Sequence, residues 1–171
     1  MLSPPDPAAG IVFEPVEITG LWSLQGNRKT RLADLVSALF TTTAQFGKPL
    51  RSEKLRLLPL WPQQAYLLSA KVTLPAAARK FEPLLTDISH GYYQFRLGGE
   101  QAFDFVSNYV SVDIAALRDD AACLRCRLGQ YTVILWWDDH QHIHLLLERS
   151  YAQSFTEHID ALISRWRPRT L

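Results

Sequence analysis

Apolar side chains recur along this chain at two spacings, one typical of helices and one typical of strands. The helical spacing occurs in three segments, residues 32–40, 102–109 and 151–166. We expect the first helix to begin near Arg28, and a weaker helix to open at Pro75, because proline is favoured at the first helical position. Each of the three stronger segments predicts an amphipathic helix with one apolar stripe on a core.

Short apolar runs bounded by turn residues predict strands in the rest of the chain. The runs are residues 11–18, 55–60, 65–70, 88–97, 122–128, 131–137 and 142–147. A Trp-Pro-Gln-Gln turn joins the second run to the third, and Gly98 with Gly99 joins the fourth to the following helix. The last three runs follow one another with short turns between them, so they predict a small meander.

The last helix has the best-defined predicted ends. Ser150 and Gln153 have the spacing of a capping box, in which each side chain accepts a hydrogen bond from the other residue's backbone N–H. Pro168 cannot continue a helix, so we expect the helix to end there.

The order of these elements predicts an α+β protein with helices packed on antiparallel sheets. Helix, strand, strand, helix occurs twice, which favours a pseudo-duplicated fold with halves of about residues 11–86 and 87–171. Chance similarity is an equally weighted explanation, because apolar strands draw on few residue types. We expect one domain over residues 11–171, preceded by a flexible, proline-rich tail of residues 1–10.

The composition is that of an ordinary globular protein. The chain has 171 residues, of which 47% are hydrophobic and 20% are charged. No apolar run approaches the roughly 18 residues that a membrane span needs. The first ten residues lack the basic and apolar parts of a secretory signal. We therefore expect a cytoplasmic protein without a membrane anchor.

The charge distribution argues against nucleic acid as a partner but leaves a protein partner open. The net charge is only +1, whereas nucleic-acid binding usually needs a strongly basic face. Residues 1–86 hold ten Lys or Arg against six Asp or Glu, and residues 87–171 hold eight against eleven. Arg28, Lys29 and Arg31 are either solvated surface or part of an interface with an acidic partner chain, because complementary charge steers association.

Cys123, Cys126, His140 and His144 have a spacing close to that of a Cys2His2 zinc site. The predicted secondary structure argues against zinc, because these histidines alternate with His142 along a strand and the two cysteines would face opposite sides of another. A redox pair is also disfavoured, because no helix begins at Cys126 to lower the thiol pKa. The sequence therefore predicts reduced thiols and no bound metal.

The adjacent Trp136 and Trp137 must face opposite sides of their strand. Both indoles can be buried inside the chain, or one can be covered by a partner, since tryptophan anchors cores and interfaces alike. We take Trp137 as a candidate for partner contact.

Several short segments follow one another in an order and spacing similar to those of a known family. Asp87-Ile-Ser-His-Gly91 is similar to an Asp-x-Ser-His-Gly element, and Leu97-Gly-Gly-Glu-Gln-Ala102 to a Leu-x-Gly-x-x-Ala continuation. The other similar segments are Leu58–Leu68, Val112–Ile114, Arg127–Gly129 and Arg149–Ala152. Together, over about residues 45–165, they resemble the gamma subunit of multi-subunit sarcosine oxidases and the related folate-binding domain of glycine-cleavage T-proteins (aminomethyltransferases).

The resemblance implies a T-protein-like fold and the role of a non-catalytic gamma-type subunit. Such a subunit packs against larger alpha and beta flavoprotein chains and stabilises a complex that oxidises sarcosine or another N-methyl amino acid. In that family the flavins, NAD and tetrahydrofolate are associated with the larger subunits, so this chain is expected to bind no cofactor. Whether it has an enzymatic activity of its own is left open by the sequence.

Asp113 supports an alternative function. The resemblance places it where T-proteins have the carboxylate that meets the folate pteridine and assists one-carbon transfer. It therefore implies a stand-alone folate-binding protein of the aminomethyltransferase type. A carboxylate that follows a helix is also a routine cap or turn residue, and both interpretations remain open.

Overall fold

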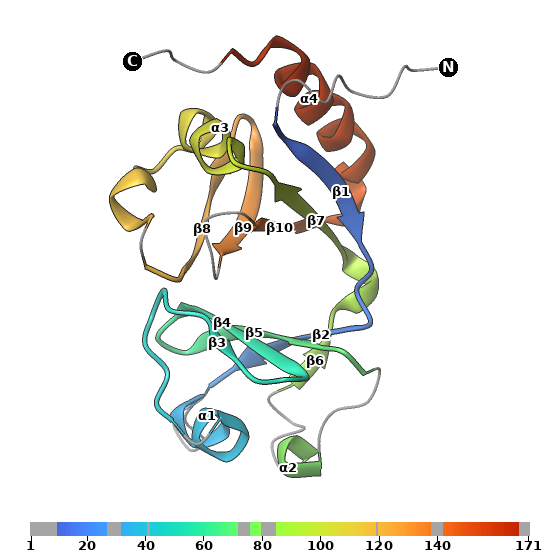
Figure 1. Ribbon diagram of the computed structural model, residues 1–171. Helices are drawn as coiled ribbons and strands as arrows, with labels where there is room; N and C mark the ends of the chain where they lie inside the picture. Colours follow the sequence, from blue (N-terminus) through green and yellow to red (C-terminus); the bar gives the residue numbers. More distant parts are fainter. Residues whose placement is uncertain are drawn as a thin grey trace. The chain divides into compact units, whose positions relative to one another are not determined.

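The fold is described by a computed structural model, which defines residues 10–26, 32–40, 42–71, 76–79, 85–118, 120–137 and 142–167 (Figure 1). The protein is α+β, with two five-stranded sheets. The chain divides into two compact units. The first unit consists of the residues up to Val16, Tyr93–Ala121 and the residues from Arg125 onward. The second unit consists of Glu17–Tyr92 and Ala122–Leu124.

One sheet, most of whose residues belong to the first unit, has the strand order β1-β7-β10-β9-β8. Its strands are β1 (Val12–Val16), β7 (Tyr92–Gly98), β8 (Ala122–Leu128), β9 (Tyr131–Trp137) and β10 (His142–Glu148). β1 is an edge strand and runs antiparallel to β7, with Pro15 opposite Phe95. β9 and β10 are also antiparallel, which confirms the pairing of the last two predicted strands.

Two helices pack on this sheet, α3 (Ala102–Tyr109) and α4 (Ala152–Arg165). α4 buries Phe155, whose ring centroid lies 5.6 Å from that of Phe95 and 5.2 Å from that of Tyr131. α3 buries Phe103, which meets Trp137 edge to face at 5.3 Å. The core of the first unit is therefore built on aromatic contacts between the helices and the sheet.

The second unit has an entirely antiparallel sheet in the order β3-β4-β5-β2-β6. Its strands are β2 (Gly20–Gln25), β3 (Leu50–Arg51), β4 (Leu55–Trp61), β5 (Gln64–Ser69) and β6 (Leu85–Asp87). The helices α1 (Leu32–Phe40) and α2 (Ala76–Arg79) belong to this unit. α1 buries Leu32, Leu35 and Val36 in a core that includes Trp22 and Leu67.

The sequence pattern predicted most elements correctly but misplaced three boundaries. The expected strand over residues 11–18 ends at Val16, and β2, which was not expected, begins at Gly20. The expected strand over residues 88–97 begins at Tyr92, because Ser89–Gly91 form a 3-10 turn. The capping box predicted for the last helix is wrong, because Arg149–Tyr151 form another 3-10 turn and hold Ser150 inside it instead of at the helix cap.

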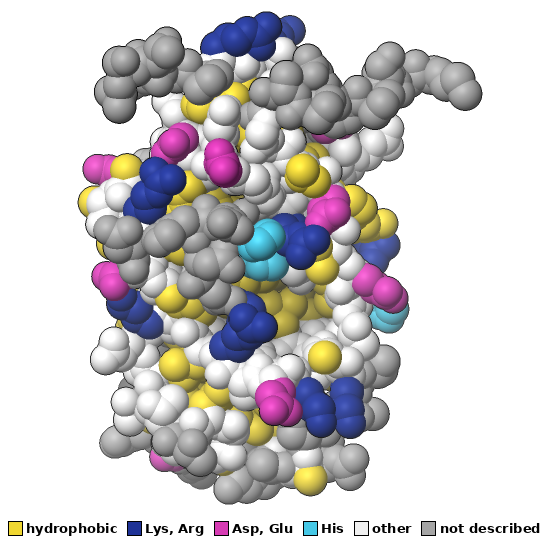
Figure 2. Space-filling model, in the orientation of Figure 1, with side chains coloured by type: hydrophobic (Ala, Val, Ile, Leu, Met, Phe, Trp, Pro, Cys, Tyr) yellow, Lys and Arg dark blue, Asp and Glu magenta, His cyan; other side chains and the backbone are white. Residues whose placement is uncertain are grey.

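The surface has mixed charge. Among the described residues on the face shown in Figure 2, Lys and Arg side chains lie between Asp and Glu side chains, without one continuous basic stripe. The longest described helix, α4, has 14 residues. No helix in the described part of the chain has both the length and the apolar character that crossing a membrane requires.

Candidate functional site

The Asp87–Gly91 segment forms a latch in the second unit. The Ser89 hydroxyl donates a hydrogen bond to Oδ1 of Asp87 at 2.6 Å, and the Ser89 backbone N–H donates to the same oxygen at 2.9 Å. In return, the Ser89 Oγ accepts a 2.8 Å hydrogen bond from the backbone N–H of Leu21, 68 positions earlier in the chain. The serine thus bonds to β2 just beyond the end of the β2–β6 ladder, where Asp87 pairs with Trp22. This part of the family-like segment therefore attaches the residues that follow β6 to strand β2.

The latch is expected to make stability depend on pH in the acid range. The Ser89 hydroxyl, followed by its N–H, holds the pKa of Asp87 below its usual value of 3.8. A depressed carboxyl pKa contributes stability above the unfolded value, and this contribution is lost as the pH falls through the lower folded value. Ser89→Ala should lower the unfolding free energy by about 1–2 kcal/mol, because Leu21 loses its hydroxyl acceptor.

Urea unfolding of Ser89→Ala and of the unchanged chain, at neutral pH and below pH 3.8, measures both effects. The variant should show the weaker acid dependence, because one of the two bonds to the carboxylate is gone. Ser154→Ala is the matched control, because Ser154 is exposed and its hydroxyl bonds only within its own turn, to the Tyr151 carbonyl at 3.1 Å. Equal stability of the Ser89 and Ser154 variants would contradict the latch.

Asp113 lies in an exposed loop of the first unit, after α3. Its Oδ1 accepts a 3.1 Å hydrogen bond from the N–H of Ala115, the first residue of a short 3-10 turn. The loop is attached to β8 by Ser111, whose N–H donates to the Arg127 carbonyl at 2.9 Å and whose hydroxyl accepts from the Arg127 N–H at 3.2 Å. Asp113 therefore caps a turn on the surface, and the attachment joins the residue before its segment to the start of the Arg127–Gly129 segment.

Both cysteines are free, as the sequence predicted, and the structure shows that both are buried. The Sγ of Cys123 lies 3.6 Å from the backbone carbonyl oxygen of Pro59. Burial raises the pKa of Cys123 to about 12 and that of Cys126 to about 11. A thiol with so high a pKa is a poor nucleophile and a poor metal ligand at neutral pH, because the thiolate is the reactive form.

Thiol labelling tests this protection. A rise from 9.0 to about 11 lowers the thiolate population of Cys126 about 100-fold at neutral pH. We expect labelling of the native protein to be at least about 100-fold slower than labelling in denaturant, where both thiols should react. Fast labelling of one thiol before unfolding would show that the strand carrying it is open in solution.

Trp137, the candidate for partner contact, is covered inside the chain, which is the other alternative that the sequence left open. Trp137 is only 1% exposed and packs on Phe103, so it belongs to the core of the first unit. Trp136 is equally buried and stacks on His144, with ring centroids 5.1 Å apart and an angle of 9° between the planes. Two adjacent indoles can both be core residues when both faces of their strand are covered.

Two other groups of predicted residues cannot be placed. Arg28, Lys29 and Arg31 lie outside the described residues, as does His140. Within the described ranges, no group of three or more His, Cys, Asp or Glu side chains is arranged to hold a metal ion. Both the basic interface and the absence of a bound metal stay predictions.

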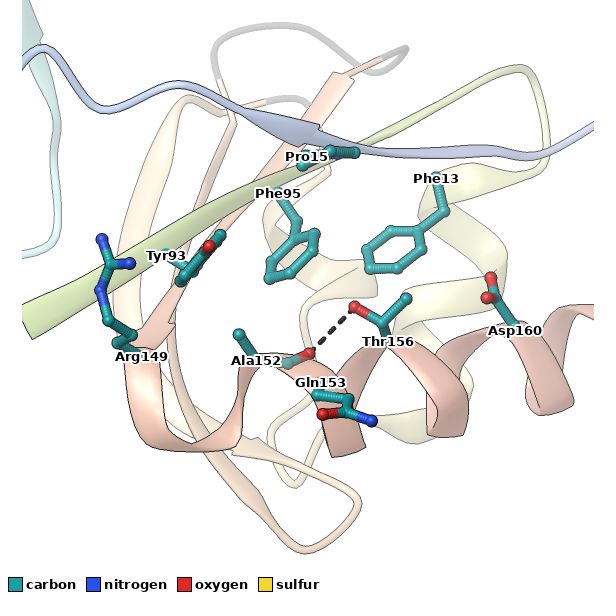
Figure 3. A pocket seen from close by; sticks show the side chains of 9 residues that line it. All are labelled: Phe13, Pro15, Tyr93, Phe95, Arg149, Ala152, Gln153, Thr156 and Asp160. Carbon is teal, nitrogen blue, oxygen red and sulfur yellow. Dashed lines mark hydrogen bonds between the residues drawn. The ribbon is translucent and has the colours of Figure 1, made fainter.

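The first unit has a groove beside α4, with a volume of about 500 Å³. Three rings, Tyr93, Phe95 and Phe13, form a row between β1 and the helix (Figure 3). Phe13 stacks on Phe95 at 5.0 Å, and Tyr93 stacks beside Phe95 at 6.2 Å. The helix side of the groove is formed by Ala152, Gln153 and Thr156.

Charged side chains lie at the two ends of this aromatic row. Arg149 is at the Tyr93 end, where its guanidinium carbon lies 4.6 Å from the ring centroid, and Asp160 is at the Phe13 end (Figure 3). Tyr93 remains 37% exposed, although most aromatic side chains of this unit are covered. The groove can therefore bury an apolar segment along its length and bind opposite charges at its ends. The sequence did not predict this groove, although two of its lining residues, Arg149 and Ala152, lie in a family-like segment.

Comparison with known proteins supports the fold suggested by the sequence resemblance. No family model and no curated protein sequence matches the chain. Among solved structures, the fold is similar to a chain of the heterotetrameric sarcosine oxidase from Corynebacterium sp. U-96 in complex with pyrrole 2-carboxylate. The TM-score is 0.78 at 15% sequence identity, and the alignment covers 96% of this chain and 92% of that one. The protein thus has the fold of a sarcosine oxidase chain, as the ordered segments predicted.

A second solved structure, the aspartate kinase of Clostridium acetobutylicum, matches with a TM-score of 0.40 and 8% identity. That match covers 90% of this chain but only 34% of the kinase, and it is too weak to indicate a common fold.

Proposed function

We propose that this chain is a non-catalytic, gamma-type subunit of a heteromeric sarcosine oxidase, or of a related flavoenzyme that oxidises another N-methyl amino acid. It stabilises the complex through contacts with larger flavoprotein chains. Flavins, NAD and tetrahydrofolate belong to those chains in this proposal. We expect the assembly to be cytoplasmic.

The observation that carries the proposal is the fold similarity to a chain of a heterotetrameric sarcosine oxidase. The alignment takes in nearly all of both chains, so the similarity concerns a small chain of about this length and not a domain of a much larger one. The ordered segments from Leu58 to Ala152 independently favour the gamma subunit and, through it, a scaffold like the folate-binding domain of T-proteins.

The positions of the candidate chemical groups also favour a supporting role. Asp87 is bonded twice to Ser89, and Asp113 caps a surface turn. Cys123 and Cys126 are buried, and burial raises the pKa of each thiol. Side chains that hold turns and fill cores stabilise a fold that partners can use as a scaffold.

Co-purification at native expression levels tests the proposal. The tagged full chain should recover flavoprotein subunits, which mass spectrometry identifies and flavin absorbance quantifies, together with sarcosine-dependent or N-methyl amino acid-dependent oxidation. Removing the chain should lower the stability of that complex. The larger subunits should still hold the flavins and carry out the flavin-dependent oxidation. Recovery of the chain without any flavoprotein would overturn the proposal.

The alternative function, folate binding through Asp113, is tested by the intrinsic tryptophan fluorescence. We expect no saturable change when reduced folate is added to the isolated chain, because Asp113 is exposed and bonded to Ala115. A saturable change in the unchanged chain that is lost in Asp113→Ala would instead establish the folate-binding function. Asp104→Ala is a suitable control, because Asp104 is also exposed and bonds to Arg118 on the same unit.

A further inference from the structure

The groove beside α4 is better suited to a segment of another protein than to a small molecule. Binding sites for small molecules are usually enclosed and present a few polar groups in fixed positions. Here the charged and amide side chains of the lining, Arg149, Gln153 and Asp160, are exposed, and the surface between them is mainly apolar. An open apolar channel of this kind is typical of a surface that receives a partner.

The spacing of the end charges indicates the length of the segment. Arg149 and Asp160 are separated by one 3-10 turn and two turns of α4, which together rise about 17 Å. An extended chain advances about 3.3 Å per residue, so five residues span the same distance. The matching segment carries an acidic residue and a basic residue about five positions apart.

The two charges can bind such a segment in one direction only. The Arg149 guanidinium carbon lies 4.6 Å from the centroid of the Tyr93 ring, and a guanidinium has several N–H donors that suit a carboxylate. Asp160 accepts hydrogen bonds from a lysine or arginine. Reversing the segment would place like charges together at both ends, which costs free energy and selects the direction.

Side chains, and not a new strand, are expected to supply the contacts. β1 is the edge of its sheet, but Pro15 has no backbone N–H to donate to an added strand. The aromatic row offers apolar surface instead, and aromatic side chains are frequent centres of binding energy in interfaces.

We propose that this groove receives an extended, apolar segment of the flavoprotein partner, with a carboxylate at Arg149 and a cation at Asp160. The inference rests on the proposed function, which supplies the partner.

Photo-crosslinking within the native complex tests the inference. A benzophenone amino acid is placed at position 156, inside the groove, or at position 154, outside it on the same helix. Ser154 is exposed and Thr156 is half-buried, but the two positions share their local bonding, because each hydroxyl donates to a backbone carbonyl of its own turn, Thr156 to Ala152 at 2.9 Å and Ser154 to Tyr151 at 3.1 Å. We expect a crosslink to a flavoprotein subunit from position 156 only, within a segment that carries the two opposite charges.

Charge reversal provides a second, independent measurement. Arg149→Glu should weaken recovery of the flavoprotein at least about tenfold, whereas Arg127→Glu, an exposed arginine of the same unit that does not line the groove, should not change it. Thermal melting of each variant alone verifies that it is folded.

The outcomes separate the two proposals. If the unchanged chain recovers no flavoprotein, the proposed function fails. If it recovers the flavoprotein but position 156 gives no crosslink to it, or Arg149→Glu and Arg127→Glu behave alike, the groove inference fails and the proposed function stands. A crosslink from position 156 to a second copy of this chain also overturns the inference, because the groove would then be a contact between identical subunits.

Discussion

Replacing Phe155 by alanine is expected to lower the free energy of unfolding by about 3–5 kcal/mol, the range observed when a buried phenylalanine is truncated. The ring is fully buried and joins α4 to three strands. Its centroid lies 6.2 Å from that of Phe13 on β1, 5.6 Å from that of Phe95 on β7 and 5.2 Å from that of Tyr131 on β9. Alanine would leave a cavity that these rings cannot fill without moving.

Phe46→Ala is the matched control, because the same atoms are removed from a side chain that is 67% exposed. That change should alter stability by no more than about 0.5 kcal/mol. Urea unfolding followed by circular dichroism and by tryptophan fluorescence measures both variants. The contacts to Phe13 and Phe95 also position the floor of the groove, so Phe155→Ala should weaken partner recovery as well. Equal losses of stability in the two variants would contradict the packing described for α4.

Gly99→Ala is expected to destabilise the protein by about 3 kcal/mol, through backbone strain and a steric clash. Gly99 has a φ of +105°, which residues with a Cβ rarely adopt. An added Cβ would also overlap the backbone carbonyl oxygen of Gly10, which cannot move aside as a flexible side chain would. The turn between β7 and α3 would have to change, and with it the approach of the chain that leads into β1.

Gly91→Ala is the control for this prediction. Gly91 lies in the other family-like segment, has no positive φ, and an added Cβ would meet no atom within 4 Å. Its variant should be nearly as stable as the unchanged chain, and it can even be slightly more stable, because alanine reduces the entropy of the unfolded state. The melting temperatures of the two variants test the predicted difference in stability. If the Gly99 variant is as stable as the Gly91 variant, the turn between β7 and α3 adapts to the added Cβ without strain.

Several of the family-like segments lie in turns and attachments that restrict their residues. Asp87 and Ser89 bond to each other and to Leu21, and Gly99 permits a close backbone approach. Ser111, which directly precedes the Val112–Ile114 segment, bonds to Arg127, the first residue of the Arg127–Gly129 segment. Such positions restrict residue type strongly, since they need a particular side-chain bond or a particular φ.

Local spacing was enough to predict α1, α3, α4 and the β8–β10 strands. Each of these has an apolar stripe or an apolar run whose period is set by its own backbone geometry. The same local reasoning failed at Ser150, because a 3-10 turn and a capped helix start differ little in the residues they accept. It left the environment of Trp137 undecided, because the composition of its strand suits an interface as well as a core.

By itself, the sequence determined the α+β class, most of the elements and, through short ordered segments, the resemblance to a sarcosine oxidase chain. Only the tertiary structure decided that Trp137 is a core residue, that Asp113 caps a surface turn, and that a groove lies beside α4. The groove combines residues 13–15, 93–95 and 149–160, which are far apart in the chain. Periodic patterns report which face of an element is buried, but they contain no information about which distant elements become neighbours. That information lies in packing between side chains, and packing is defined only once the chain has folded.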